Sequence, residues 1–196
     1  MFIQIIQGKC TRPDELRAMA TSWREDLGGG ADGWLGGTYG FTDDDEFIGV
    51  VRFESREAAM ANSQRPEQAA WAEKMMALMD GPVEFHDCDD VMLFMEGGSD
   101  DAGFVQVIRG RTDDPGRIKA MLADTTTLHE MRPDILGGTL AIEADGTFTE
   151  TIAFRDEAAA RQGEQMEPPP EVRAELESMM VGARFYDLHD PWFESN

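Results

Sequence analysis

Residues 2–19 read Phe2-Ile-Gln-Ile-Ile-Gln-Gly-Lys-Cys-Thr-Arg-Pro-Asp-Glu-Leu-Arg-Ala-Met19, and residues 104–121 read Phe104-Val-Gln-Val-Ile-Arg-Gly-Arg-Thr-Asp-Asp-Pro-Gly-Arg-Ile-Lys-Ala-Met121. The two stretches align without a gap, and seven of their 18 positions are identical. Further matches follow in the same order, among them Leu35–Thr38 with Leu136–Thr139 and Phe53 with Phe154. Matches that recur in one order at a nearly constant offset are typical of a tandem duplication.

The duplication predicts two repeats in a chain of 196 residues, each of a size that one small domain can have. We place the first repeat at residues 1–96 and the second at residues 104–196. Residues 97–103 form the predicted linker, because this stretch is polar and rich in glycine, as flexible linkers are.

Within each repeat the hydrophobic periodicity predicts the order β-α-β-β-α-β. In the first repeat residues 2–9 have the composition of a strand, and a helix follows that Pro13 opens and Gly28–Gly30 ends. Residues 34–41 and 47–53 are predicted to pair as a hairpin across an acidic turn. Ser55 opens another helix, which Pro66 interrupts, and residues 83–88 form the last strand.

This order is that of the ferredoxin-like sandwich, in which helices cover one face of an antiparallel sheet. A single repeat would leave the other face of its sheet exposed. We therefore predict an α+β fold in which the two ferredoxin-like repeats pack sheet to sheet, as an intrachain version of the dimeric α+β barrel.

Composition excludes several classes of function. The 39 acidic and 17 basic residues give a formal net charge of -22, which opposes binding to nucleic acid or to an anionic membrane. No apolar run is long enough to span a bilayer, and the first residues lack the features of a signal peptide. With two cysteines, Cys10 and Cys88, a disulfide-rich secreted scaffold is excluded. We expect a cytoplasmic protein without a disulfide.

One segment of the first repeat resembles a known family. Phe53-Glu-Ser-Arg-Glu-Ala-Ala59, followed by Asn62, Pro66 and Trp71, is similar to the segment that opens the second helix in the antibiotic biosynthesis monooxygenase family. This family belongs to the dimeric α+β barrel superfamily. The resemblance implies a hydrophobic pocket between sheet and helices, and it covers nearly the whole chain as a tandem, fused-dimer relative.

The family includes oxygenases that use no cofactor and haem-degrading enzymes. The haem degraders carry an Asn on the first strand, a Trp on the second helix and a His about ten residues later. Here Gln7 lies near the Asn position and Trp71 fits the Trp, but residues 80–82 read Asp-Gly-Pro, so the axial His is missing. We therefore rank haem degradation last.

In the oxygenases, polar and aromatic groups around an apolar cavity hold a phenolic substrate. Six residues of the first repeat fit these roles. His86 and Asn62 are the candidate catalytic residues, as a general base and as a hydrogen-bonding partner of a substrate oxygen. The candidate substrate-binding residues are Trp71, Trp34, Tyr39 and Gln4.

Each assignment has a structural alternative. Trp34 and Trp71 also fit core packing, and His86 fits a surface histidine paired with the acidic residues that follow it. Gln4 and Gln106 occupy equivalent strand positions, so they fit a hydrogen-bond feature shared by both repeats as well as a pocket role.

The second repeat matches these candidates poorly. Asn62 corresponds to Gln162 or Gly163, and a run of three prolines, Pro168–Pro170, replaces part of the helix that carries Trp71. His129 and Tyr186 are this repeat's own polar candidates. We therefore expect any site to lie in the first repeat.

The sequence contains no nucleotide-binding glycine loop and no serine-hydrolase elbow, and His86-Asp87-Cys88-Asp89 alternates across a strand instead of converging on a metal. We predict no cofactor and no metal. The primary hypothesis is a small-molecule-binding barrel. The alternative is a cofactor-independent monooxygenase acting on an aromatic phenol or quinol. The expected partner is a small aromatic molecule, and we expect a monomer, with at most a weak dimer.

Overall fold

The structure, a computed structural model, describes residues 1–168 and 170–196. It divides the chain into two compact units. Unit 1 comprises Met1–Asp89 and Trp192–Asn196, and unit 2 comprises Asp90–Pro191. Of the proline run singled out in the second repeat, Pro169 lies outside the described residues.

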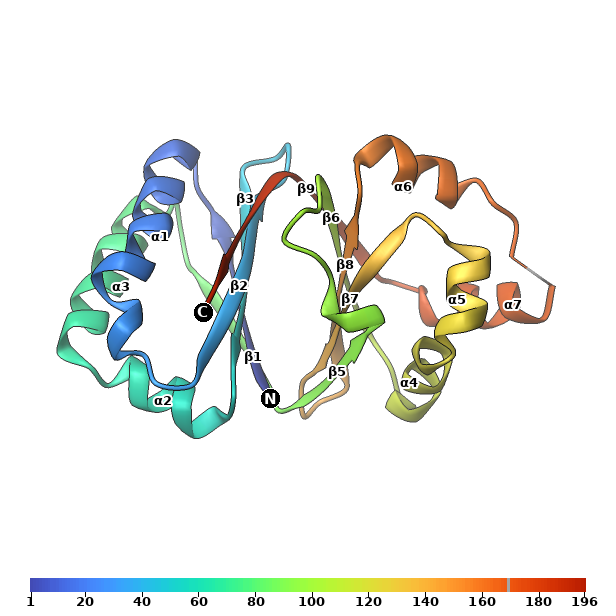
Figure 1. Cartoon of the computed structure of the whole chain (residues 1–196), viewed down its shortest axis with the longest axis horizontal. Coiled ribbons are helices and arrows are strands. Elements are labelled where there is room, and N and C mark those ends of the chain that lie inside the picture. The colour runs from blue at the N-terminus through green and yellow to red at the C-terminus, as the bar shows by residue number, and fades with distance from the viewer. Residues whose placement is uncertain (169) are drawn as a thin grey trace. The chain divides into compact units, whose positions relative to one another are not determined.

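Unit 1 is a ferredoxin-like sandwich. Its sheet has the strand order β4-β1-β3-β2, and each neighbouring pair is antiparallel. The helices of this unit lie on one face of the sheet (Figure 1). Its elements are β1 (Phe2–Lys9), α1 (Pro13–Asp26), the 3-10 turn η1 (Gly28–Gly30), β2 (Trp34–Phe41), β3 (Glu46–Phe53), α2 (Arg56–Ser63), α3 (Pro66–Leu78) and β4 (Glu84–Cys88).

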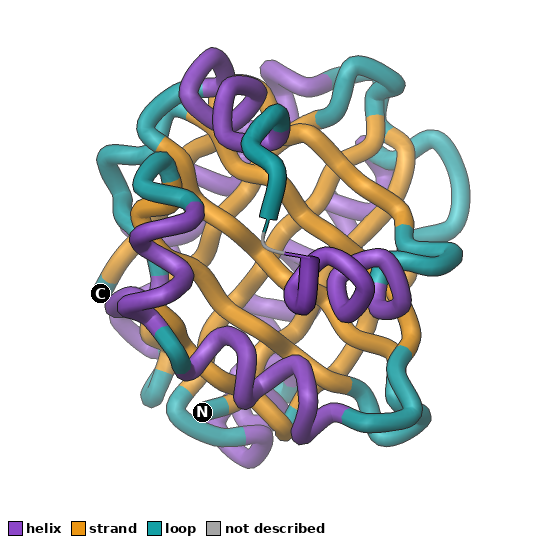
Figure 2. Tube along the Cα trace, turned by 90° about the vertical axis from the view of Figure 1, so that its right-hand side faces the viewer, coloured by secondary structure: helices purple, strands orange, loops and turns teal. Residues whose placement is uncertain are grey.

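Unit 2 repeats this arrangement. Its strand order is β9-β6-β8-β7-β5, of which the first four correspond to β4-β1-β3-β2 of unit 1. Figure 2 shows the helices of this unit in front of its strands. Its elements are β5 (Asp90–Phe94), η2 (Met95–Gly97), β6 (Phe104–Arg111), α4 (Pro115–Ala123), α5 (Thr125–Met131), β7 (Ile135–Ile142), β8 (Thr147–Phe154), α6 (Glu157–Glu164), α7 (Pro170–Met179) and β9 (Arg184–Ser195). The predicted α+β class and the two ferredoxin-like repeats are confirmed.

The units differ from the predicted repeat boundaries in two short segments. β5 belongs to the first repeat in sequence, yet it pairs with β7 of unit 2, with Phe94 opposite Gly138. The end of β9 belongs to the second repeat, yet Trp192–Asn196 is part of unit 1. Each repeat therefore gives its last strand segment to the sheet of the other unit. The main segment of unit 1 ends at Asp89, whereas the predicted first repeat ends at residue 96.

Equivalent caps begin the second helix of each repeat. The side chain of Ser55 accepts a hydrogen bond from the backbone N–H of Ala58, and Asp156 accepts one from Ala159. Such caps satisfy backbone donors that the first turn of a helix leaves unpaired. The caps place Asn62 and Gly163 at the same position, the seventh residue of α2 and of α6, where both are buried.

Trp192 packs into the core of unit 1. Its ring stacks on Tyr39 and Phe41 at centroid distances of 5.4 and 5.9 Å, and the guanidinium of Arg17 lies 5.0 Å from its centroid. The end of the chain thus supplies an aromatic side chain to a core built mainly by the first repeat.

Three further observations concern the predictions from composition. Cys10 and Cys88 are both buried, and they form no disulfide with each other in the structure. Within the described ranges, no helix is both long and apolar enough to cross a membrane. The same residues contain no group of three or more His, Cys, Asp or Glu side chains that could hold a metal ion.

Candidate functional site

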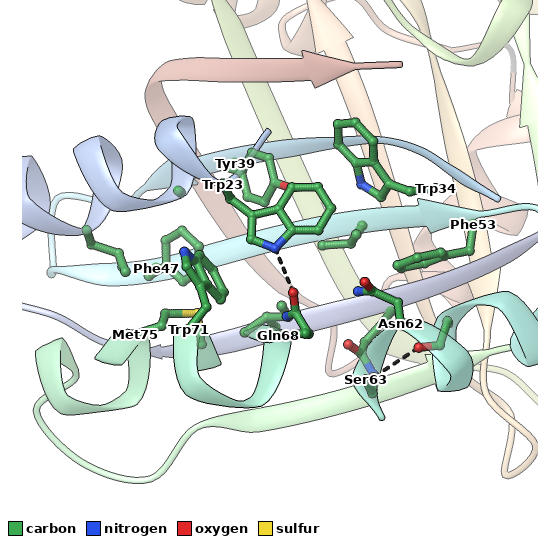
Figure 3. Close-up of a pocket in the computed structure, with 16 residues that line it drawn as sticks. Trp23, Trp34, Tyr39, Phe47, Phe53, Asn62, Ser63, Gln68, Trp71 and Met75 are labelled. Carbon is green, nitrogen blue, oxygen red and sulfur yellow. Dashed lines mark hydrogen bonds between the residues drawn. The ribbon is translucent and has the colours of Figure 1, made fainter. Parts of the chain in front are cut away.

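A cavity of about 80 Å³ lies between the sheet and the helices of unit 1. One water molecule needs roughly 10–15 Å³, so the cavity has room for a small organic molecule. Six of its 16 lining residues are aromatic, and Figure 3 shows the lining side chains. The lining residues that matter for its chemistry are Gln4, Trp23, Trp34, Tyr39, Phe53, Asn62, Gln68 and Trp71.

Strand alternation decides which side chains reach the cavity. On β1, Gln4 and Ile6 line it, whereas Ile5 between them points to the other face of the sheet. On β3, Val51 and Phe53 line it by the same rule. The helices close the other side, with Trp23 from α1, Asn62 from α2 and Gln68 and Trp71 from α3.

The structure brings five of the six predicted site residues to this cavity, and it places His86 elsewhere. His86 is directly opposite Ile5 in the pairing of β1 with β4. Opposite residues of neighbouring strands share a face, so His86 lies on the face of the sheet away from the cavity. Its Nε2 atom is 3.4 Å from a carboxylate oxygen of Glu84. The five residues at the cavity are Gln4, Trp34, Tyr39, Asn62 and Trp71.

The amide of Asn62 has a fixed orientation. Asn62 is 6% exposed, and its Oδ1 accepts a hydrogen bond of 2.9 Å from Nη1 of Arg65. Arginine can only donate, so the oxygen of the amide must face Arg65. No described residue accepts a hydrogen bond from Nδ2 of Asn62, and this N–H₂ group remains available to a ligand.

Two further donors belong to the cavity. Gln68 Oε1 accepts a hydrogen bond of 2.7 Å from the indole of Trp23, which leaves the N–H₂ group of Gln68 without an acceptor among the described residues (Figure 3). The indole nitrogen of Trp34 is buried and, within the described part of the chain, has no hydrogen-bond partner. A buried donor without a partner, such as the indole N–H of Trp34, is uncommon, and a ligand in the cavity could pair with it.

Gln4 contributes an acceptor. Its Nε2 donates to Asp87 at 2.9 Å, so its carbonyl oxygen remains free at the cavity. Gln106 makes the equivalent 2.9 Å hydrogen bond to Asp187 in unit 2. The shared bond gives Gln4 the structural role that its repeat position indicated, while its place on the cavity wall also leaves it able to touch a ligand.

The cavity contains no ready general base. Tyr39 is the one ionisable side chain among the described lining residues. Burial raises the pKa of its phenol far above the ordinary value of 10.0, with Arg52 opposing this shift and Glu194 adding to it. Tyr39 therefore stays a neutral phenol at physiological pH and can donate or accept a hydrogen bond.

In unit 2 an ion pair lies against the position that corresponds to Asn62. Gly163 takes the place of Asn62, and a Cβ atom there would collide with the ion pair of Arg132 and Asp134. The guanidinium of Arg132 lies 5.6 Å from the ring centroid of Phe154, which corresponds to Phe53 of unit 1. In unit 2 a planar charged group thus lies next to the phenylalanine that corresponds to Phe53 of unit 1.

The two candidates that the sequence offered in the second repeat do not form a comparable site. His129 is exposed in the last turn of α5. Tyr186 is opposite Val107 on β6, so it lies on the sheet face away from Gln106 and Ile108.

Sequence reasoning missed a buried carboxyl group in unit 2. Glu150 on β8 is 6% exposed and is opposite Ile108 on β6 and Leu140 on β7, both in the core. No described residue forms a hydrogen bond or ion pair with its carboxyl group. Burial raises the pKa of Glu150 from 4.5 to about 7. The available signal was an acidic residue at a core-facing position of the alternating run Phe148–Phe154.

The fold is shared with solved structures of several bacterial proteins. The "Putative monooxygenase" from Fusobacterium nucleatum superposes with a TM-score of 0.77 at 9% identity, over 100% of this chain and 94% of that chain. An anthrone oxidase-like protein gives a TM-score of 0.69 at 8% identity, over 99% and 92%. An uncharacterised ferredoxin-fold protein from Listeria monocytogenes, related to antibiotic biosynthesis monooxygenases, gives 0.53 at 10% identity, over 100% and 95%.

At identities this low, these structures establish the fold and leave the activity open. They confirm the resemblance to proteins of the antibiotic biosynthesis monooxygenase type at the level of structure. No protein-family model matches the sequence, and no curated protein matches it.

Proposed function

We propose that unit 1 binds a small planar aromatic molecule that carries an oxygen acceptor, such as a ring carbonyl or a phenolate oxygen. The observation that supports this proposal is a set of three N–H donors at one cavity: the buried indole N–H of Trp34, which has no partner among the described residues, and the N–H₂ groups of Asn62 and Gln68, whose amide oxygens already accept hydrogen bonds. Leaving a buried donor unsatisfied costs roughly 1–3 kcal/mol. A ligand oxygen would recover part of this free energy, which an apolar ligand would not.

The walls of the cavity favour a flat ligand. Trp23, Trp71 and Phe53 offer aromatic faces and edges against which a ring can pack. Unit 2 supports this reading, because there the flat guanidinium of Arg132 packs over Phe154 at the equivalent place. We therefore infer that the ligand ring lies over Phe53, with its oxygen directed to Asn62.

Replacing Asn62 with Leu is expected to weaken the binding of chromone, a flat bicyclic ketone, about tenfold. The variant keeps the approximate size of the side chain but removes the proposed hydrogen bond to the ligand, together with the bond that Arg65 donates to Asn62. A change of about 1.4 kcal/mol corresponds to tenfold in Kd. Isothermal titration calorimetry measures the change. The matched control is Gln162→Leu at an exposed position of α6, which should bind chromone like the unmodified protein. Equal affinities of the two variants would remove Asn62 from the site.

A second candidate function is cofactor-independent oxygenation of a phenol or quinol. The same donors favour it, because they would stabilise the anionic oxygen of an ionised substrate. In such a reaction a ring CH₂ group and O₂ give a carbonyl group and water. Since the described lining residues provide no carboxylate, imidazole or amine, the substrate would have to enter already ionised or lose its proton to water.

An oxygen electrode with anthrone as the probe tests this candidate. The oxygenase proposal expects O₂ uptake above the spontaneous rate, and it expects most of that uptake to disappear in Asn62→Leu while Gln162→Leu retains it. Uptake equal to that of a protein-free solution would leave ligand binding as the function of the cavity. We do not propose haem degradation, since the described lining residues include no His or Cys that could ligate iron.

A further inference from the structure

Arg65 connects three parts of unit 1 behind the cavity. It precedes Pro66 at the start of α3, and its side chain is 19% exposed. Its Nη1 atom donates to the backbone oxygen of Leu27 at 3.1 Å and to Oδ1 of Asn62 at 2.9 Å. The bond to Leu27 attaches the guanidinium to the end of α1, so Asn62 is held from a second element as well as from its own helix.

Gly30 makes room for this guanidinium. A Cβ atom at position 30 would lie 2.5 Å from Nη2 and 2.9 Å from Cζ of Arg65, closer than real Cβ contacts. The end of a flexible side chain is what would have to move, so an added methyl group would displace Arg65 and leave the backbone in place. At the neighbouring Gly29, an added Cβ would meet nothing within 4 Å. In the glycine run after α1, a side chain at position 30 would therefore collide with Arg65, whereas a side chain at position 29 would not.

We propose that Arg65, seated against Gly30, is a positioning residue that fixes the amide of Asn62 with its N–H₂ group toward the cavity and thereby selects ligands with an oxygen acceptor. Selection of ligands rests on the proposed function of the cavity, whereas the orientation of the amide does not. The physical basis is the polarity of the guanidinium, which has five N–H donors and no acceptor. Rotating the amide by half a turn would bring its N–H₂ group against these donors.

Unit 2 shows the same region without this device. Gly163 replaces Asn62, and the side chain of Arg132 is paired with Asp134. Position 163 of unit 2 therefore carries no side-chain amide that an arginine could orient. The combination of Gly30, Arg65 and Asn62 belongs to unit 1, and Asn62 lines the cavity of this unit.

The first test needs no ligand. The chain has only two asparagines, Asn62 and Asn196, so selective ¹⁵N labelling of asparagine gives two side-chain amide signals. We expect nuclear Overhauser effects between the Hδ2 protons of Asn62 and ring protons of the cavity. They should fall at least by half in Arg65→Met and in Gly30→Ala, and they should persist in Gly29→Ala. Undiminished effects in both Arg65→Met and Gly30→Ala would overturn the proposal.

The second test measures selectivity. Chromone offers only acceptors, whereas indole, a smaller flat molecule of two fused rings, offers an N–H donor. Calorimetry is expected to show tighter binding of chromone than of indole, with the ratio of the two affinities reduced about tenfold in Arg65→Met and Gly30→Ala and kept in Gly29→Ala. General damage to the cavity would weaken both ligands and leave the ratio unchanged, which would contradict a selective role for Arg65.

The two tests separate the failure of one claim from the failure of the other. If the unmodified protein binds neither compound, the proposed function fails, and the amide signals still decide the role of Arg65. If Arg65→Met does not fold, Gly30→Ala still tests the role of Arg65. This variant is expected to fold, because it adds one methyl group at a position whose backbone φ is not in the left-handed region.

Discussion

Replacing Glu150 with Gln is expected to raise the free energy of unfolding by about 3 kcal/mol at pH 8 and to change it little at pH 4.5 or below. The carboxyl group has a pKa of about 7 in the folded protein, because it is buried, and an ordinary value of 4.5 when exposed. Each pKa unit of difference corresponds to about 1.4 kcal/mol. Gln resembles the protonated carboxylic acid but cannot ionise.

The sign follows from proton binding. Between pH 4.5 and pH 7 the folded protein binds more protons at Glu150 than the unfolded chain does, so stability from this group falls as the pH rises. The loss is complete above pH 7, where both states are ionised. The contribution is fully present below pH 4.5.

Urea unfolding at pH 4.5, pH 6 and pH 8 measures the difference between Glu150→Gln and the unmodified protein. Taking this difference removes the effects of the other carboxyl groups. Glu130→Gln is the matched control, since Glu130 is exposed on α5, and it should change stability by a similar small amount at each pH. A pH-independent effect of Glu150→Gln would show that the Glu150 carboxyl is not desolvated in the folded protein.

Replacing Trp192 with Ala is expected to destabilise the protein by about 3–5 kcal/mol, as is typical of a buried Trp cut back to Ala. Trp192 is 7% exposed, stacks on Tyr39 and Phe41, and lies beneath the guanidinium of Arg17. The alanine variant would leave a cavity beside aromatic residues that cannot close around it. Because Tyr39 and Phe47 of the same cluster also line the ligand cavity, chromone binding should weaken as well.

Urea unfolding monitored by circular dichroism tests this prediction. Trp192→Phe keeps an aromatic ring and removes an indole nitrogen that, among the described residues, has no hydrogen-bond partner, so it should cost much less than Trp192→Ala. Phe185→Ala is a control at an exposed position and should have little effect. If Trp192→Ala cost no more than Phe185→Ala, the end of the chain would have no part in the core of unit 1.

The order of helices and strands could be predicted because each signal is local. Pro13 and Pro66 begin helices, Ser55 caps one, and apolar residues alternate along the strands. The exchange of the final strand segments could not be predicted. Residues 90–94 and 192–195 have strand-like sequences whichever neighbour they pair with, and their partners are decided by tertiary packing.

Part of the candidate site could also be predicted, because its signals are local in the sequence. The sequence pointed to Asn62 and Trp71 through their spacing on the second helical segment, and both line the cavity. His86 differs, since moving one residue along a strand reverses the face on which a side chain lies. Gln68 and Arg65 carry no sequence signal of their own, because their roles depend on hydrogen bonds to Trp23 and Asn62 that only the folded chain forms.

The most direct test of the ligand proposal is a crystal structure of the protein grown with chromone. The proposal predicts electron density for the flat ring over Phe53, with the carbonyl oxygen within hydrogen-bond distance of Asn62 Nδ2 or Trp34 Nε1. A structure in which the cavity of unit 1 contains only water or protein side chains at saturating chromone, or in which chromone binds solely outside it, would contradict the proposal.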